Sequence, residues 1–175
     1  ALPEVKIMIL EPFVLKGSGT QDNWEEFDLQ VKKRSQMAEK IARLHLLLQE
    51  AGVKPQDKIA LCGRNSASWA VAFLASMTYG AVPVPILNDF KAESIHNIVN
   101  HSDARILWAD DAILSAISLD EMKALEVVVQ LGDNAIVYSK DEKLIAYNED
   151  LDKHFRQKYP NGFTPNDVVV HDEQP

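Results

Sequence analysis

Short apolar runs alternate with amphipathic segments along most of this chain, and no other feature constrains its fold as strongly. Strands that alternate with helices are typical of a layered parallel sheet covered on both faces. The sequence therefore predicts an α/β fold: a three-layer, doubly wound, mostly parallel sheet with helices on both faces. The predicted strands are residues 58–62, 82–85, 105–109, 127–131 and 136–138, and the predicted helices are residues 67–79, 91–101 and 119–123.

Several residues predict where these elements begin, end or lie. Asn65 or Ser66 is expected to cap the helix at 67–79, and Gly80 is expected to stop it. Pro83 and Pro85 limit the pairing of their strand to an edge of the sheet or to the strand ends. Within the helix, one stripe is expected to hold Trp69, Ala72, Phe73 and Met77.

A long helix is predicted before the first of these strands. Asn23 and Glu26 have the spacing of a capping pair at its start, and Gly52 fits a left-handed stop just past its end. A strand at residues 5–15 and a loop at 16–20 are expected before it. The apolar spacings of three, four and seven that predict the helix are those of Trp24, Phe27, Val31, Ala38, Ile41, His45 and Leu48.

Composition bounds the class of protein. A chain of 175 residues that is 46% hydrophobic fits one α/β domain over residues 1–175. Its 18 basic and 26 acidic residues give a net charge of −8, which argues against nucleic acid as a partner. No apolar stretch approaches the roughly 20 residues of a membrane span, and no secretion signal is apparent. The charged segment at 139–160 is placed outside the sheet.

Cys62 and one glycine-containing loop are weighed as functional residues and set aside. A single cysteine excludes an internal disulfide and favours a reducing, cytoplasmic location. Cys62 lies in an apolar run and is predicted to pack in the core rather than to react. Gly17-Ser18-Gly19 has the position of a dinucleotide loop, but Asp22 stands where the third glycine belongs and would repel a pyrophosphate.

The remaining polar motifs predict no site either. His96 and His101 are five residues apart, so they do not share a helical face as paired metal ligands do. The acidic pairs have no calcium-loop pattern around them, and the basic cluster is interpreted as a solvated helix face. These motifs are Asp110-Asp111, Asp150 with Asp152, and Lys32-Lys33-Arg34.

The sequence GVKPQDKIALCGRNSASWAVAFLASMTYGAVPVPI at residues 52–86 resembles the opening of acyl-CoA synthetases, especially bacterial long-chain fatty-acid ligases. The motif residues are Gly63-Arg64-Asn65-Ser66 with Trp69, the strand at 79–86, and the helix end at 100–104. The similarity covers about residues 41–175. It implies an ATP-dependent ligase that joins a carboxylic acid to coenzyme A through an acyl-adenylate, and ATP, magnesium and coenzyme A for the full-length enzyme.

The same resemblance implies that the catalytic parts of the family lie beyond Pro175. These parts are the Ser/Thr/Gly-rich phosphate loop ending in Lys, the adenine pocket, the magnesium carboxylate and the catalytic Lys. We therefore expect an amino-terminal scaffold fragment that does not catalyse alone, binds no cofactor, and has no catalytic, cofactor-binding or metal-binding residue of its own. Surface that the rest of the ligase normally covers is expected to favour a homodimer.

Residues 1–40 resemble a different family, the SGNH (GDSL-type) hydrolases, through EPFVL at 11–15 and NWEEF at 23–27. This predicts a chimera with a seam at about residues 40–46, inside the long helix. The segment lacks the Gly-Asp-Ser block and the Asp-x-x-His pair that such a hydrolase needs. The alternatives are a natural ligase with a divergent first element, an engineered or recombined α/β fold without activity, and, remotely, an esterase fragment.

Overall fold

The computed structural model describes residues 21–163. The predicted strand at 5–15, the loop at 16–20 and the Gly17–Gly19 motif lie outside the described residues. Within the described part, no helix is both long and apolar enough to cross a membrane.

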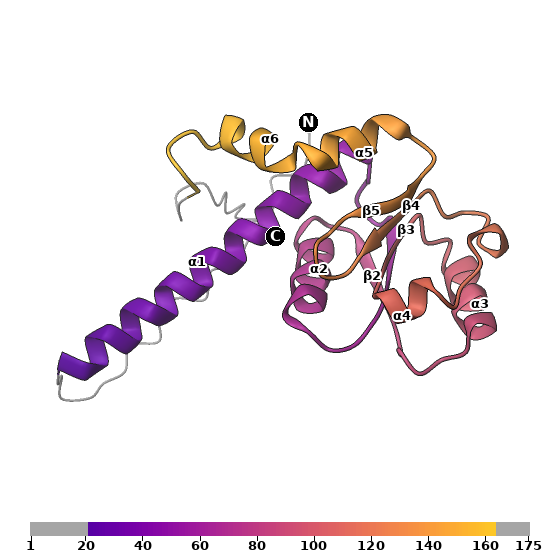
Figure 1. The fold of residues 1–175 in the computed structure, drawn as a ribbon, viewed down its shortest axis with the longest axis horizontal. Coiled ribbons are helices and arrows are strands. Elements are labelled where there is room, and N and C mark those ends of the chain that lie inside the picture. Colours follow the sequence, from indigo (N-terminus) through magenta and orange to yellow (C-terminus); the bar gives the residue numbers. More distant parts are fainter. Residues whose placement is uncertain (1–20, 164–175) are drawn as a thin grey trace, which may run out of the picture.

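A five-stranded sheet forms the centre of the molecule (Figure 1), with the strand order β2-β1-β3-β4-β5. The pairings β1–β2, β1–β3 and β3–β4 are parallel, and β4–β5 is antiparallel. The strands are β1 Lys58–Cys62, β2 Val82–Ile86, β3 Ile106–Ala109, β4 Val127–Gln130 and β5 Ile136–Ser139. The mostly parallel sheet is confirmed, and β2 lies at an edge, as its two prolines predict.

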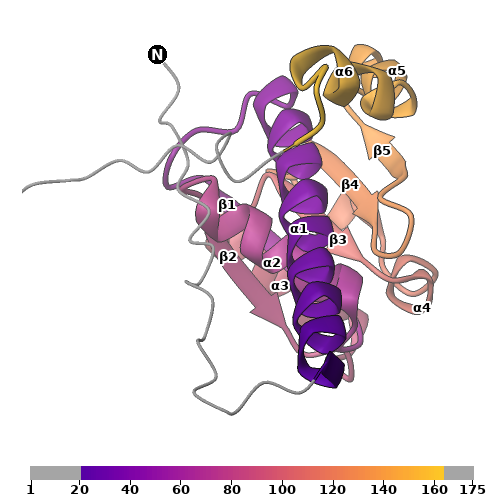
Figure 2. The ribbon, with the colours of Figure 1, turned by 90° about the vertical axis from the view of Figure 1, so that its left-hand side faces the viewer.

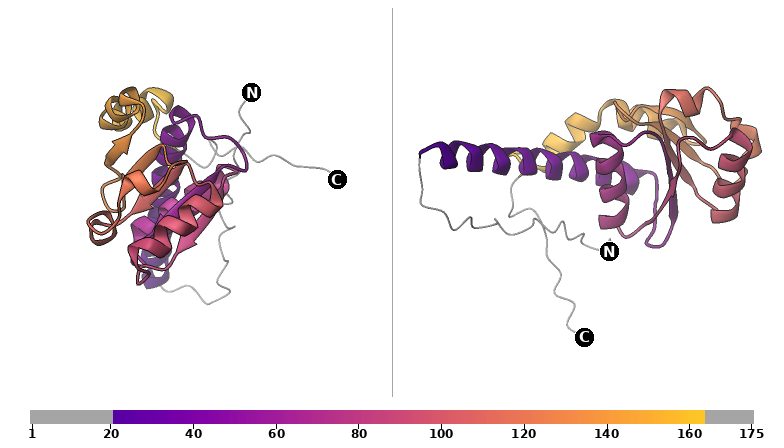
Figure 3. Two further views of the ribbon diagram at one scale, coloured as in Figure 1. Left: turned by 90° about the vertical axis from the view of Figure 1, so that its right-hand side faces the viewer. Right: turned by 90° about the horizontal axis from the view of Figure 1, so that it is seen from below.

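Helices cover both faces of the sheet, which confirms the three-layer arrangement (Figures 2 and 3). One face packs against α1, α2 and α5, and the other against α3 and α4. The helices are α1 Gln21–Glu50, α2 Ala67–Thr78, α3 Ala92–Ser102, α4 Asp111–Leu114, α5 Glu142–Glu149 and α6 Leu151–Lys158, with a 3-10 turn η1 at Leu119–Glu121. The short α4 was not predicted from the sequence.

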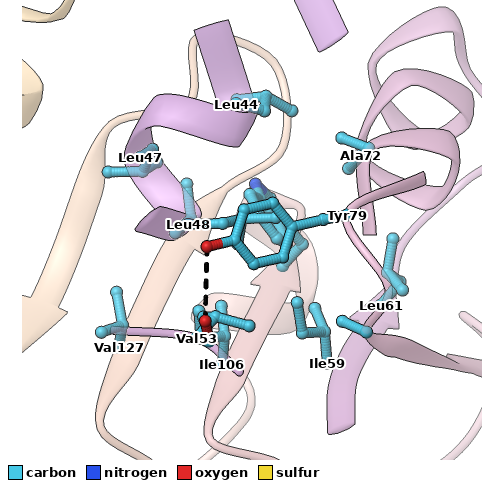
Figure 4. Packing of buried hydrophobic residues seen from close by; sticks show 14 of the residues in the cluster. Leu44, Leu47, Leu48, Val53, Ile59, Leu61, Ala72, Tyr79, Ile106 and Val127 are labelled. Atoms are coloured by element: carbon cyan, nitrogen blue, oxygen red, sulfur yellow. Dashed lines mark hydrogen bonds between the residues drawn. The ribbon is translucent and has the colours of Figure 1, made fainter. Parts of the chain in front are cut away.

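The period-two alternation of the strands divides the core between the two faces. Ile59 and Leu61 of β1 point towards α1 and α2, whereas Ala60 and Cys62 point towards α3. Tyr79 lies in the part of the core on the α1 and α2 side of the sheet, where its hydroxyl donates to the Val53 carbonyl at 3.3 Å (Figure 4). Figure 4 labels the neighbours of Tyr79 in this cluster: Leu44, Leu47, Leu48, Val53, Ile59, Leu61, Ala72, Ile106 and Val127.

The helix α1 ends as predicted but begins earlier than predicted. Gly52 has φ 65°, and the Val53 N–H bonds to the Leu48 carbonyl at 3.0 Å, which is the pattern of a Schellman stop. The predicted capping position of Asn23 is wrong, because the helix already includes Gln21. Figures 1 and 3 show the first part of α1 extending away from the sheet.

Only part of the predicted apolar stripe of α1 can be compared with the structure. Ala38, Ile41 and Leu48 are buried, and His45 is half-buried against α2. The side chains of Trp24, Phe27 and Val31 are among those that the structure does not describe. A third apolar cluster joins α1 to α6 through Ala42, Leu46 and Phe155. The charged segment at 139–160 thus lies outside the sheet after Ser139, as predicted, and folds as α5 and α6.

Candidate functional site

The carboxyl edge of the parallel strands is the first place to look for a site. In open α/β sheets, ligands bind outside the carboxyl ends of the strands, where the strand order reverses. Here β2 lies on one side of β1, and β3 and β4 follow on the other side, so the reversal falls between β1 and β3. The loop that follows β1 and the residues that follow β3 therefore bound the candidate crevice.

Asp110 follows β3 at this edge of the sheet and precedes α4. One carboxylate oxygen accepts the backbone N–H of Arg64 at 3.0 Å, and the other accepts that of Ile113 at 3.1 Å, which caps α4. A Cβ on Gly63 would stand 2.7 Å from Leu131 Cδ1 and 3.3 Å from Asp110 Oδ2. Asp110 therefore joins the loop after β1 to the start of α4, and the absence of a side chain at Gly63 lets the two segments lie close together.

The Gly63–Ser66 loop has a capping role in the described structure. The Ser66 hydroxyl accepts the Trp69 N–H at 3.1 Å and caps α2, so Ser66 rather than Asn65 is the cap. The side chains of Arg64 and Asn65 are exposed. The residues Gly63–Ser66, on which the resemblance rests, thus lead into α2, which Ser66 caps. In the described contacts, none of their side chains is paired with a base or with another nucleophile.

Cys62 is buried at the end of β1, as predicted. Its thiol donates to the Leu87 carbonyl at 3.8 Å. Burial, together with the nearby negative charge of Asp110, raises the pKa of the Cys62 thiol to about 11. Because the thiolate is the nucleophile, Cys62 is unreactive near neutral pH.

The structure does not bring together into one site the histidines and acidic pairs that the sequence analysis considered. His96 accepts the Ser118 N–H at 3.0 Å, and His101 is exposed. Among the described residues, no group of three or more His, Cys, Asp or Glu side chains could hold a metal ion. The acids have structural partners instead: Asp111 bonds to Gln130, Asp150 pairs with Lys153 at 3.1 Å, and Asp152 pairs with Arg43 at 2.9 Å.

Two polar centres were missed by the sequence analysis. At the amino edge of the sheet, the Arg105 guanidinium bonds to Asp57 at 2.6 Å and to Glu126 at 2.6 Å. The pKa of Asp57 is lowered: its burial would raise it, but the Lys54 N–H and Arg105 outweigh burial. The second centre is His45, which faces α2. No short sequence motif predicts either centre, because the interacting residues are far apart in the sequence. The partners of Arg105 are 48 and 21 residues away, and those of His45 are 30 and 33 residues away.

Comparison of the sequence with models of known protein families identifies the family of this chain. Residues 33–171 match the model described as AMP-binding enzyme. The chain belongs to the AMP-binding enzyme family. The match begins within α1, before the seam predicted at about residues 40–46, which itself stays a prediction.

Curated relatives of this AMP-binding family chain include acyl-CoA ligases. It is 27% identical over 75 residues to long chain acyl-CoA synthetase 4 of Arabidopsis thaliana, covering 43% of this chain and 11% of that protein. It is 29% identical over 108 residues to a long-chain-fatty-acid–CoA ligase of Mycobacterium bovis, covering 58% of this chain and 18% of that protein. The chain thus spans less than a fifth of the length of either relative.

A solved structure shows that the AMP-binding family chain has the fold of such enzymes. The anthranilate CoA ligase AuaEII in complex with anthranoyl-AMP matches with a TM-score of 0.57 at 20% identity, over 69% of this chain and 22% of that one. The sheet and helices described above therefore have the fold of part of that ligase.

Proposed function

We propose that this chain supplies the amino-terminal scaffold of an ATP-dependent acyl-CoA ligase and does not catalyse acyl transfer by itself. The observation that carries the proposal is the family match over residues 33–171. At the carboxyl edge of the sheet that this match covers, the Asp110 carboxylate accepts two backbone N–H groups. In the complete enzyme, the carboxylate of the substrate would attack ATP to give an acyl-adenylate and pyrophosphate, and the thiol of coenzyme A would then displace AMP.

The described residues do not fit ATP or magnesium at the crevice. Both carboxylate oxygens of Asp110 already accept backbone N–H groups, and the nearby Arg64 side chain points to an exposed surface. Phosphate binding in such folds needs free N–H groups at a helix start, yet the Trp69 and Ile113 N–H groups bond to Ser66 and Asp110. ATP, magnesium and coenzyme A are therefore assigned to parts of the enzyme outside these residues.

We further propose a fatty acid as the acyl substrate of the complete enzyme and the cytoplasm as its location. The names of the two curated ligases support the fatty acid, and the single buried cysteine supports a reducing compartment. An acidic net charge of −8 supports the absence of a nucleic-acid partner. Self-association of the isolated chain stays a prediction that sedimentation equilibrium tests.

The origin of residues 1–40 is a separate proposal. A seam at about residues 40–46 would join an SGNH-hydrolase-like segment to the ligase-like segment within α1, and it would account for a helix of 30 residues. The alternative, a recombined fold without any ligase role, also predicts no turnover. The family match from residue 33 favours the ligase scaffold.

Two measurements test the scaffold function. The isolated chain should release no pyrophosphate from ATP with magnesium and a long-chain fatty acid, and its melting temperature should not change. A ligand at a hundredfold excess over its dissociation constant would stabilise the chain by about 2.7 kcal/mol, so a clear shift would contradict the proposal.

The second measurement asks whether the chain serves as a ligase part. Residues 33–171 replace the matching segment of the Mycobacterium bovis ligase, and acyl-CoA formation is measured. The unmodified ligase is the positive control, and the same graft with a charged residue placed in the buried sheet, Leu107→Asp, is the negative control. A graft that folds cooperatively but forms no acyl-CoA would contradict the proposed function.

A further inference from the structure

The turn that follows α6 holds the only Asn-Gly pair in the sequence, Asn161-Gly162. The run Tyr159-Pro160-Asn161-Gly162 has the pattern that type I turns favour, with proline in the second position and glycine in the fourth. In the structure, the Gly162 N–H donates to the Tyr159 carbonyl at 3.0 Å, and Gly162 has φ 82°, which glycine adopts without strain. The turn therefore places an asparagine directly before a residue that has no side chain.

The amide of Asn161 and the backbone of Gly162 are open to water. Both residues are exposed. Apart from the two chain neighbours of Gly162, no heavy atom lies within 4 Å of the point where a Cβ on Gly162 would stand. Asparagine is a chemically labile residue, because the backbone nitrogen of the next residue can attack its side-chain carbonyl carbon. A following glycine hinders that attack least, so position 161 combines the most reactive sequence context with free access for water.

We propose that Asn161 is a site of spontaneous deamidation whose rate is set by the opening of this turn. The Gly162 nitrogen loses its proton to solvent base and forms a bond to the side-chain carbonyl carbon of Asn161. The bond from that carbon to the amide nitrogen breaks, ammonia leaves, and a cyclic succinimide results. Water then opens the succinimide at either carbonyl and leaves aspartate or isoaspartate at position 161. The net reaction takes up water, releases ammonia and needs no other reactant.

The folded turn slows this reaction, because the N–H that must lose its proton is bonded to the Tyr159 carbonyl. Three aromatic residues keep the turn closed, and we call Phe155, Tyr159 and Phe163 the aromatic clasp. The Phe163 ring packs edge-on against Tyr159, with centroids 5.2 Å apart, and its centroid lies 6.2 Å from that of Phe155. Phe155 itself is buried. Deamidation therefore requires a local opening in which Phe163 leaves the clasp.

The two products differ in their effect on the fold. Aspartate leaves the course of the main chain unchanged. Isoaspartate carries the main chain through its side-chain carbon, so the backbone between positions 161 and 162 gains a methylene and Phe163 can no longer keep its place. The clasp packs against Ala42 and Leu46 of α1. The formation of isoaspartate therefore loosens the contact between α6 and α1.

Peptide mass spectrometry of the folded chain, sampled during incubation near neutral pH at body temperature, tests the proposal. Asn88 is the matched control, because it is also exposed in a turn but precedes Asp89 instead of a glycine. We expect Asn161 to gain the mass of deamidation at least tenfold faster than Asn88. Equal rates at the two positions would overturn the proposal. The readout does not depend on turnover, so it is independent of the proposed ligase role.

Opening the turn tests the role of the fold. Phe163→Ala removes a ring of the clasp and should speed the deamidation of Asn161 at least threefold, whereas Phe90→Ala removes an exposed ring elsewhere and should leave the rate unchanged. Urea that unfolds the chain should speed the reaction at least threefold without any substitution, and a rate equal to that of the folded chain would overturn control by the turn.

A last variant tests the attacking atom. Gly162→Ala is measured in the same urea, where the positive φ of the folded turn no longer matters, and it should slow the deamidation of Asn161 at least fivefold. An unchanged rate would show that the Gly162 nitrogen is not the attacking group and would overturn the proposed reaction.

Discussion

Lowering the pH from 7 to 5 is expected to destabilise the folded chain through His45, which joins α1 to α2. The His45 Nε2 atom lies 2.9 Å from the Thr78 hydroxyl and 3.2 Å from the Ala75 carbonyl. The Thr78 hydroxyl donates its own proton to the Leu74 carbonyl at 2.7 Å. His45 Nε2 therefore carries the hydrogen, and protonation adds a charge at Nδ1 inside the contact between the two helices.

The size of the effect follows from the pKa of His45. Burial lowers this pKa from 6.5 to about 4, and the positive charge of Lys158 adds to the lowering, while the bond to Ala75 opposes it. The folded state therefore takes up the proton at lower pH than the unfolded state, and stability falls as the pH drops through 6.5 towards 4. One pKa unit corresponds to about 1.4 kcal/mol, so the loss reaches about 2 kcal/mol at pH 5 and about 3 kcal/mol below pH 4.

Urea denaturation between pH 7.5 and pH 5 measures this loss in the unmodified chain and in His45→Gln, which keeps a donor but does not titrate. The stability difference between the two should change by about 2 kcal/mol over this range in favour of the variant. His101→Gln, on the exposed surface of α3, controls for removing an imidazole. A difference between the unmodified chain and His45→Gln that stays constant with pH would refute the reasoning.

Two further predictions concern the loops and the amino edge of the sheet. Gly63→Ala should lower the free energy of unfolding, measured by urea denaturation, by about 1–3 kcal/mol, because the added methyl overpacks against Leu131. Adding Leu131→Ala to the same chain should restore part of this loss. If the losses from the two substitutions are strictly additive, overpacking against Leu131 is not the cause. Arg105→Met should lower the free energy of unfolding by about 1–3 kcal/mol, because two carboxylates lose a charged partner. Lys153→Met, which removes an exposed ion pair, is the control and should change the free energy of unfolding by less than about 0.5 kcal/mol. Equal effects of the two substitutions would show that the Arg105 bonds do not stabilise the fold.

Local sequence signals were reliable where one short segment decides its own conformation. The strands β1, β3 and β4 are short apolar runs because they are buried on both faces, and their predicted bounds agree to within one residue. The stops at Gly52 and Gly80 need a positive φ, which glycine adopts without strain. The start of α1 was placed wrongly, since a capping pair is a short pattern that also occurs inside helices.

The resemblance to a ligase also came from the sequence alone, and the family match confirms it. For the candidate site, the sequence predicted no catalytic, cofactor-binding or metal-binding residue, and this stays a prediction. The use of Asp110 as a link to Arg64 was not visible, because these residues are 46 positions apart.

The sequence by itself determined the alternation of the strands and most helices, the bounds of β1, β3 and β4 to within one residue, and the family, because each depends on residue types that are close together along the chain. Tertiary structure alone decided the order β2-β1-β3-β4-β5, the antiparallel β5, and the burial of His45. It also decided that the side chain of Met77 is exposed. These properties depend on which distant segments meet, and only the packing of both faces of one sheet brings those segments together.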